Sequence, residues 1–144
     1  MRIVVDSNLL VLAFLQPNGL ASQLMLTIIA KNHSLLLSNE IVLEVSRVLR
    51  YPRMINLHAA SEKDVYNFVG WLRIVAEMIA FDPFVPAPIR DESDIFVLQT
   101  ALSGGAEILC TCDRDFFEPP ASIFLESRGT AVLTDAQLMR KLNA

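Results

Sequence analysis

Residues 1–14 read MRIVVDSNLLVLAF, and a carboxylate, Asp6, closes the first apolar stretch. The apolar run Ile3–Val5 is typical of a buried strand. A charged carboxylate at the end of a buried segment is costly unless it is paired or coordinated. Asp6 therefore either caps a structural element or holds a ligand, and the rest of the chain has to decide between the two.

The composition is typical of a folded globular domain. The chain has 144 residues, of which 53% are hydrophobic, and its mean hydropathy is +0.42, so disorder is not expected. No uninterrupted apolar run approaches the roughly 18 residues of a membrane span. The N-terminus also lacks the basic start, apolar stretch and cleavage site of a signal peptide. We expect one domain over residues 1–144, located in the cytoplasm and without membrane contact.

Charge and cysteine content exclude several classes of protein. The net charge is −4 and the sequence pI is about 5.1, which is not the basic character of a typical nucleic-acid binder. Acidic residues gathered in a metal site would contribute to this negative charge. Cys110 and Cys112 are too close in sequence for a structural disulfide. A zinc site needs about four ligands, and His33 and His58 are the only histidines, so we expect the two cysteines to be ordinary thiols of a strand.

Strands and helices are expected to alternate along the chain. The expected strands cover residues 2–5, 34–38, 107–111 and 129–134. The expected helices cover residues 9–15, 20–32, 39–52, 61–79, 93–105 and 135–143, with a turn at 16–19 and a proline-rich connector at 81–90 that could include a short strand. Strands separated by helices predict a parallel sheet that is covered by helices on both faces.

Four acidic residues are expected to meet at one edge of this sheet. Asp6 and Asp113 each follow directly after a strand. Glu44 lies one turn inside the helix that follows the second strand, and Asp94 lies in the first turn of the helix after the connector. Ligands of open parallel sheets bind beyond the carboxyl ends of the strands, where these segments begin or end.

Carboxylates gathered in this way repel one another and raise each other's pKa values. A divalent cation removes the repulsion, and oxygen ligands suit Mg²⁺ or Mn²⁺, which also bind phosphate oxygens. Such a site permits metal-assisted attack of water on a phosphodiester.

Each acid also has an ordinary structural interpretation. Asp94, together with Asp91, could cap the start of its helix. Glu44 could be a solvated helix residue, and Asp113 and Asp115 could be turn residues. Spacing alone does not choose between these roles and a metal site.

Four stretches resemble, in order, the motifs of a known family. IVVDSNLL (residues 3–10) resembles an opening strand that ends in D-[ST]-N, and residues 38–54 resemble a helix with a single internal Glu. RDESDIFVLQTALSGGAEILCTCDRDFF (residues 90–117) resembles the signature R-D-x-x-D…T-x-D-x-D-[FL]-[FL], and GTAVLTDAQLM (residues 129–139) the closing strand and helix. Over residues 2 to about 138 the chain resembles the PIN domain family, in particular the bacterial toxins of toxin–antitoxin systems (VapC-like).

The resemblance implies a fold, an activity and partners. The implied fold is of the α/β class, a three-layer α/β/α sandwich with a central parallel sheet of four to five strands. The implied activity is metal-dependent cleavage of RNA with Mg²⁺ or Mn²⁺. Expected partners are an RNA substrate, an antitoxin protein and a second copy of the chain in a homodimer.

The resemblance also assigns roles to residues of this sequence. Asp6, Glu44, Asp94 and Asp113 match the catalytic and metal-binding acids, and Asp115 matches a further acid at the metal. Supporting roles next to these acids fall on Ser7, which would orient the first Asp, and on Asn8 and Asp91. The sequence departs from the family pattern at Ile95, Phe96 and Cys112, where Asn, Lys and Gly are common.

Contact with RNA would have to come from local positive charge. Arg47 and Arg50 lie along the Glu44 helix, and Arg90 and Arg114 flank two of the acidic segments. We take Arg47, Arg50 and Arg114 as candidates for phosphate contacts, since Arg pairs well with phosphate. Ordinary surface charge is the alternative.

Two other functions are to be weighed against an RNA-cleaving enzyme. A catalytically silent PIN module that binds RNA or a protein would be expected to lack one of the four acids, and none is missing. A phosphatase or phosphoacceptor domain that uses Asp6 as nucleophile would need a Lys after a strand or a D-x-D motif. No lysine follows a strand, and the motif is not present at Asp6, because Asn8 fills its third position.

Overall fold

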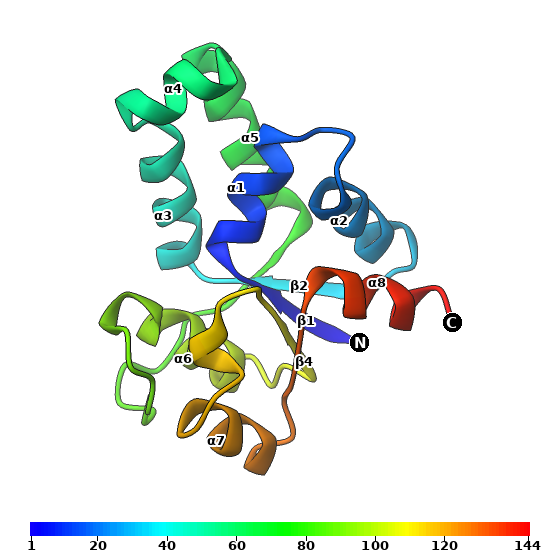
Figure 1. Ribbon diagram of the computed structural model, residues 1–144, viewed down its shortest axis with the longest axis vertical. Helices are drawn as coiled ribbons and strands as arrows, with labels where there is room; N and C mark the ends of the chain where they lie inside the picture. The colour runs from blue at the N-terminus through cyan, green and yellow to red at the C-terminus, as the bar shows by residue number, and fades with distance from the viewer.

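A five-stranded sheet lies at the centre of the computed structural model, which describes residues 1–144 (Figure 1). Its strands are β1 (Arg2–Val5), β2 (Ser34–Leu37), β3 (Glu77–Met78), β4 (Ile108–Cys110) and β5 (Ala131–Leu133). They are arranged in the order β3-β2-β1-β4-β5, and every neighbouring pair is parallel. The predicted α/β class with a central parallel sheet is confirmed.

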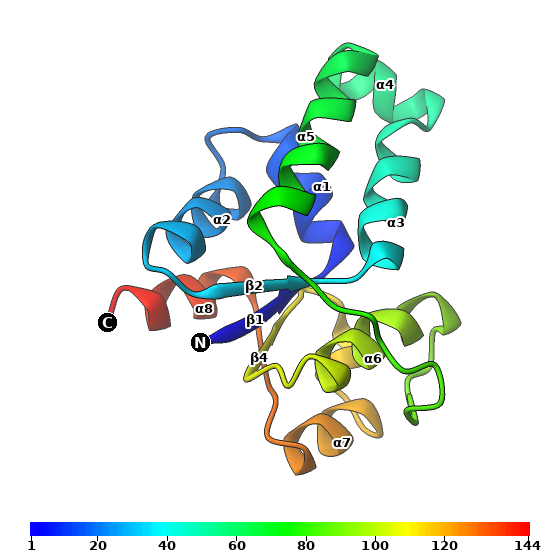
Figure 2. The ribbon, with the colours of Figure 1, turned by 180° about the vertical axis from the view of Figure 1, so that it is seen from behind.

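Helices cover both faces of the sheet (Figures 1 and 2). They are α1 (Ser7–Leu15), α2 (Leu20–Ala30), α3 (Asn39–Leu49), α4 (Pro52–His58), α5 (Glu62–Val75), α6 (Ile95–Ser103), α7 (Ala121–Ser127) and α8 (Asp135–Leu142), with short 3₁₀ turns η1 (Glu92–Asp94) and η2 (Arg114–Phe116). Helices α1, α2, α3 and α5 lie on one side of the sheet, and α6 and α7 lie on the other. From β1 the chain first adds β2 and β3 on one side of β1 and then β4 and β5 on the other. Because crossovers between parallel strands keep the same hand, the helices of the second half cover the opposite face of the sheet.

The central strands are apolar because both of their faces are buried. Residues Ile3–Val5 and Leu35–Leu37 are at most 1% exposed, as expected for strands between two helical layers. In this register Val5 lies opposite Cys110, and the next residues along the two strands are Asp6 and Thr111. Polar residues therefore begin where the buried strands end, at the same edge of the sheet.

The helix expected over residues 61–79 is shorter than predicted. It begins with a capping box between Ser61 and Asp64 but ends at Val75. Ala76 is extended, β3 follows, and the Ile79 amide donates to the Leu37 carbonyl at 2.7 Å. The apolar helical period had continued through this segment, but pairing with β2 overrides it. The short strand considered for the connector 81–90 is absent there. The additional strand is β3, which lies just before the connector.

Two helices were not expected. Pro52 ends the predicted helix over residues 39–52 but also occupies the first turn of α4. Proline suits that position, since the first helical amide has no partner inside the helix. Helix α7 is seven residues long and follows η2 after a Pro-Pro pair, where the sequence has no long apolar period. By contrast, the helix expected over residues 93–105 ends close to the predicted position: α6 ends at Ser103, and Gly105 adopts φ +61° two residues later.

No single helix has the length and apolar composition needed to cross a bilayer. Helices α1 and α2 would meet both criteria only if counted together, and the break between them is bent by 107°.

Candidate metal centre

Asp6 lies just beyond β1 and is 2% exposed. Its amide donates to the Cys110 carbonyl at 3.0 Å, which continues the β1–β4 pairing and fixes its backbone. Although Asp6 precedes α1, its side chain makes no capping hydrogen bond to that helix. Its carboxylate instead accepts from Thr111 Oγ1 at 2.8 Å and lies 3.3 Å from Ser7 Oγ. The capping interpretation of Asp6 is therefore wrong.

Ser7 connects Asp6 to Glu44. The Ser7 hydroxyl is 2.8 Å from Glu44 Oε2 and can donate its proton to either carboxylate. Glu44 lies on α3, which packs against α1, and is half-buried. A solvated helix surface residue would not face a buried hydroxyl of another helix, so the position of Glu44 agrees with the interpretation that it belongs to the acidic group.

Thr111 is a buried residue of this edge to which sequence reasoning gave no role. It directly follows β4 and is fully buried. Its hydroxyl donates to Asp6 and accepts from the Asp113 amide at 3.0 Å. The signal that could have identified Thr111 is its position, because it ends a buried strand as Asp6 does and lies two residues before Asp113.

Asp94, Asp113 and Asp115 form the tightest acidic group. Each offers a carboxylate oxygen, and these three oxygens lie within 4.8 Å of one another. Asp113 sits at the start of η2, where its side chain accepts from the Asp115 amide at 2.9 Å, so its expected turn role is present as well. Asp94 lies in η1, a segment more than fifteen residues earlier in the sequence. We call these three residues, with Asp6 and Glu44, the acidic cluster.

The side chain of Asp94 has no structural role in capping its helix. It occupies the position before α6 without a side-chain capping bond, while Asp91 performs capping by accepting from the Ser93 amide. Asp94 is 9% exposed, and its buried Oδ2 atom has no hydrogen-bond partner. An unpartnered buried oxygen of this kind is rare in folded proteins and calls for an explanation. A bound cation would explain it, because the neighbouring carboxylates would attract one.

The electrostatics of the acidic cluster are unfavourable without a cation. Burial, followed by the nearby Asp113 carboxyl, raises the pKa of Asp94 to about 8. Burial also raises the pKa of Asp6, although hydrogen bonds from Thr111 and Ser7 lower it in part. A positive charge placed among these groups would reverse both effects.

The available ligand atoms suit a hard divalent cation. All are carboxylate oxygens, and neither Cys nor His belongs to the group of three. Oxygen ligands of this kind are typical of Mg²⁺, Mn²⁺ and Ca²⁺ rather than of zinc or copper. The residues therefore fit the Mg²⁺ or Mn²⁺ expected from the sequence.

The other residues predicted around the site differ in how they relate to the acidic cluster. Asn8 and Asp91 are exposed; the Asp91 carbonyl accepts from the Asp94 amide at 3.0 Å, while the Asp91 side chain accepts from Ser93. Arg47 and Arg114 are exposed and form no ion pair, so they remain available for a ligand. Arg50 pairs with Glu62 at 2.7 Å and also contacts Ser46, so part of its hydrogen-bonding capacity is already used.

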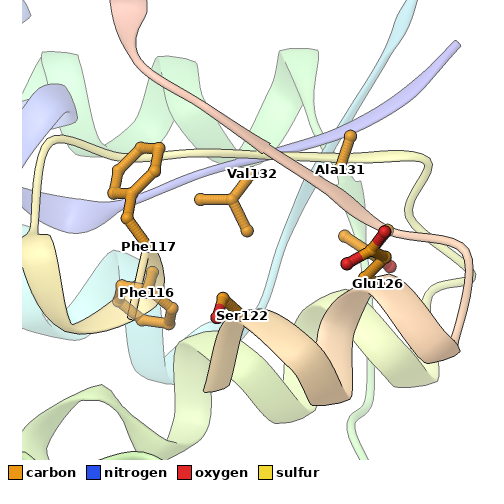
Figure 3. Close-up of a pocket in the computed structure, with 7 residues that line it drawn as sticks. Phe116, Phe117, Ser122, Glu126, Ala131 and Val132 are labelled. Atoms are coloured by element: carbon orange, nitrogen blue, oxygen red, sulfur yellow. The ribbon is translucent and has the colours of Figure 1, made fainter. Parts of the chain in front are cut away.

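The pockets of the molecule do not include the acidic cluster. None of the five contains a cluster residue. One pocket of about 300 Å³ begins at Phe116, next to Asp115, and runs between α7 and β5. Figure 3 shows Phe116 and Phe117 at one end of it and Glu126 and Ala131 at the other.

Thr111→Val is expected to destabilise the protein by about 1–3 kcal/mol, because a buried carboxylate and a backbone amide both lose a partner without a change in side-chain shape. It should also weaken binding of a cation, since the Asp6 carboxylate is no longer oriented. Thr111→Ser keeps the hydroxyl and is the matched control. Urea denaturation and Mn²⁺ titration of both variants measure the two effects. Equal behaviour of Val and Ser variants would contradict the role given to this hydroxyl.

Comparison with known proteins identifies the family. A chain in the crystal structure of VapBC2 from Rickettsia felis, bound to a DNA fragment from their promoter, shares the fold with a TM-score of 0.62; the match covers 93% of this chain and 98% of that one at 14% identity. No significant match is found among curated proteins. The family model for the PIN domain matches residues 2–115, a range that includes the whole acidic cluster. On this evidence the chain belongs to the PIN domain family.

Proposed function

We propose that this protein is a metal-dependent endoribonuclease that hydrolyses RNA phosphodiester bonds with Mg²⁺ or Mn²⁺. The observation that carries the proposal is the convergence of five acids from four separate segments, one of which holds a buried oxygen without a partner. Membership of the PIN domain family supports it. The acidic residues, Asp6, Glu44, Asp94, Asp113 and Asp115, are all present.

The residues of the acidic cluster and their neighbours would have different roles in this reaction. Asp94, Asp113 and Asp115 would hold the cation, and Asp6 and Glu44 would complete its surroundings. Thr111 and Ser7 keep the Asp6 carboxylate in one orientation, which a buried, rigid strand end favours. A bound divalent cation would polarise the phosphodiester and make water a better nucleophile at neutral pH.

RNA would be held by arginines around the acidic edge. Arg47 and Arg114 are exposed and without carboxylate partners. Arg50 would have to leave Glu62 to contribute, so we rank it below the other two. Arginine offers phosphate a bidentate set of donors, and these contacts would offset the repulsion between RNA and the acidic cluster.

We further propose that the protein is the toxin of a toxin–antitoxin pair that acts in the cytoplasm. The structural similarity to a chain of the VapBC2 complex supports a protein partner. Apolar side chains also project into solvent from the α3–α5 region, where Leu43 is 49%, Tyr66 70% and Ile74 83% exposed. Exposed apolar groups that lie together are typical of protein interfaces. An antitoxin and a second copy of the chain in a homodimer are the proposed partners.

Mn²⁺ is expected to stabilise the folded protein, because it binds the acidic cluster only when the chain is folded. The gain should be about 2.7 kcal/mol at a hundredfold excess over Kd. Thermal melts in Mn²⁺ and in EDTA, together with cleavage of single-stranded RNA by the same preparation, test this. Stabilisation with RNA binding but no cleavage would favour a silent binding module. Identical melts would contradict the metal site itself.

A further inference from the structure

Arg90 is the one basic side chain that forms an ion pair with a residue of the acidic cluster. Its guanidinium lies 3.9 Å from Asp115 Oδ1 and 3.6 Å from Glu118 Oε2. Both distances exceed those of ordinary hydrogen bonds, so charge alone holds the group there. The Arg90 side chain is 70% exposed, and an exposed ion pair of this kind is weak and easily exchanged.

The turn that follows Arg90 is held by hydrogen bonds, while the guanidinium of Arg90 is held only by weak ion pairs. The next residue, Asp91, begins η1 by accepting hydrogen bonds from both the amide and the hydroxyl of Ser93. That turn carries Asp94 into the acidic cluster. The long side chain of Arg90 therefore starts from a defined place beside the cluster and can swing without any rearrangement of the fold.

A cation and Arg90 compete for the same carboxylate. Asp115 is one of the three residues whose oxygens lie within 4.8 Å of one another. When Asp115 binds a divalent cation, the cation neutralises its charge. The cation and the Arg90 guanidinium then repel each other. Arg90 then loses one of its two anionic partners at the moment when a phosphate can approach the cation.

We propose that Arg90 forms a phosphate-binding position that opens when the cation binds. In the cation-free protein Asp115 and Glu118 occupy the guanidinium. In the cation-bound protein Asp115 no longer pairs with the guanidinium, which keeps only Glu118 and can pair with a phosphate of single-stranded RNA lying at the acidic cluster. This inference rests on the proposed nuclease function and adds to it an order of binding, in which the cation prepares the site for RNA.

The first arm of the test is Mn²⁺ binding to the full chain by calorimetric titration. Arg90→Gln should bind Mn²⁺ roughly threefold to tenfold more tightly than wild type, because a competing positive charge a few ångströms away is removed. Arg90→Lys keeps that charge and should resemble wild type. Arg140→Gln, an exposed arginine on α8 without an ion pair, is the control for net charge.

The second arm is the salt dependence of binding to single-stranded RNA, with Ca²⁺ in place of Mn²⁺ and a gel to verify that the RNA stays intact. With Ca²⁺, Arg90→Gln should lower the slope of log K against log salt by about 0.7, the value for one phosphate contact in single strands. In EDTA the difference between the slopes of variant and wild type should be smaller, since Asp115 and Glu118 then compete with the phosphate for the arginine. Arg140→Gln should match wild type in both conditions.

Several outcomes would overturn the inference. Unchanged Mn²⁺ affinity in Arg90→Gln would show that Arg90 does not compete for Asp115. An unchanged slope with Ca²⁺ would show that Arg90 is only a counter-ion, and a slope difference as large in EDTA as in Ca²⁺ would show that the cation plays no part. In each case wild type would still bind Mn²⁺ and cleave RNA. If wild type itself fails to bind Mn²⁺, the proposed function fails, and this inference with it.

Discussion

Asp6→Asn is expected to lower RNA cleavage by several orders of magnitude while the protein stays folded. The amide has the shape of the carboxylate but lacks the negative charge that would hold the cation, and metal catalysis supplies most of the rate in such sites. The fold should persist because the amide oxygen can still accept a hydrogen bond from Thr111 or Ser7. Removal of a buried charge should even stabilise the cation-free form, since burial raises the pKa of Asp6.

Melting and cleavage should be measured on one preparation of Asp6→Asn. Glu126→Gln is the matched control, because it removes one exposed carboxylate at a distance from the acidic cluster and should change neither quantity. A purely structural Asp6 predicts the opposite pattern. A destabilised variant with full activity per folded molecule would refute the catalytic role of this residue.

Asp94→Asn is expected to change the pH dependence of stability. In the folded protein the pKa of Asp94 is about 8, against an ordinary value of 3.8. The unfolded chain therefore loses this proton at lower pH than the folded chain. Between these two values the folded state binds more protons, so stability falls as pH rises from about 4 to about 8 and is level above that. The Asn variant lacks this loss and should be more stable than wild type above pH 8.

Urea denaturation of wild type and Asp94→Asn in EDTA, from pH 4 to pH 9, measures this difference. It should grow with pH up to about 8, the pKa of Asp94, and then stay constant. With Mn²⁺ the order should reverse, because only wild type gains the binding energy. Asp91→Asn is the control in the same turn, since hydrogen bonds from Ser93 lower rather than raise the pKa of Asp91. A stability difference independent of pH would contradict the buried, protonated state of Asp94.

The sheet could be predicted because its strands differ in composition from everything around them. The runs Ile3–Val5 and Leu35–Leu37 have no polar residue, and helical periods separate them from the next strand. The strand β3 could not be predicted in this way. It has two residues, both exposed, and exists because the amide of Ile79 and its neighbours meet the free edge of β2. Such pairing depends on a long-range contact that local sequence does not encode.

The candidate site was predictable to the level of elements but not of contacts. Asp6 and Asp113 could be placed together because parallel strands end at a common edge. The sequence did not show which of Asp91 and Asp94 caps the turn. The geometry of η1 decides it: the Asp91 side chain caps the turn, and Asp94 Oδ2 is left without a hydrogen-bond partner. The pairing of Arg50 with Glu62 likewise joins residues of different elements, and their spacing in sequence gives no sign of it.

The most direct test of the account is the location of the cation. Crystals of the wild-type protein soaked in Mn²⁺ should give an anomalous difference peak among the carboxylates of Asp94, Asp113 and Asp115, on the side of Asp6 and Glu44. The same experiment on Asp94→Asn should give a weaker peak or none. A wild-type protein that cleaves RNA but shows Mn²⁺ elsewhere, with no peak at the acidic cluster, would contradict the claim that these residues form the metal centre.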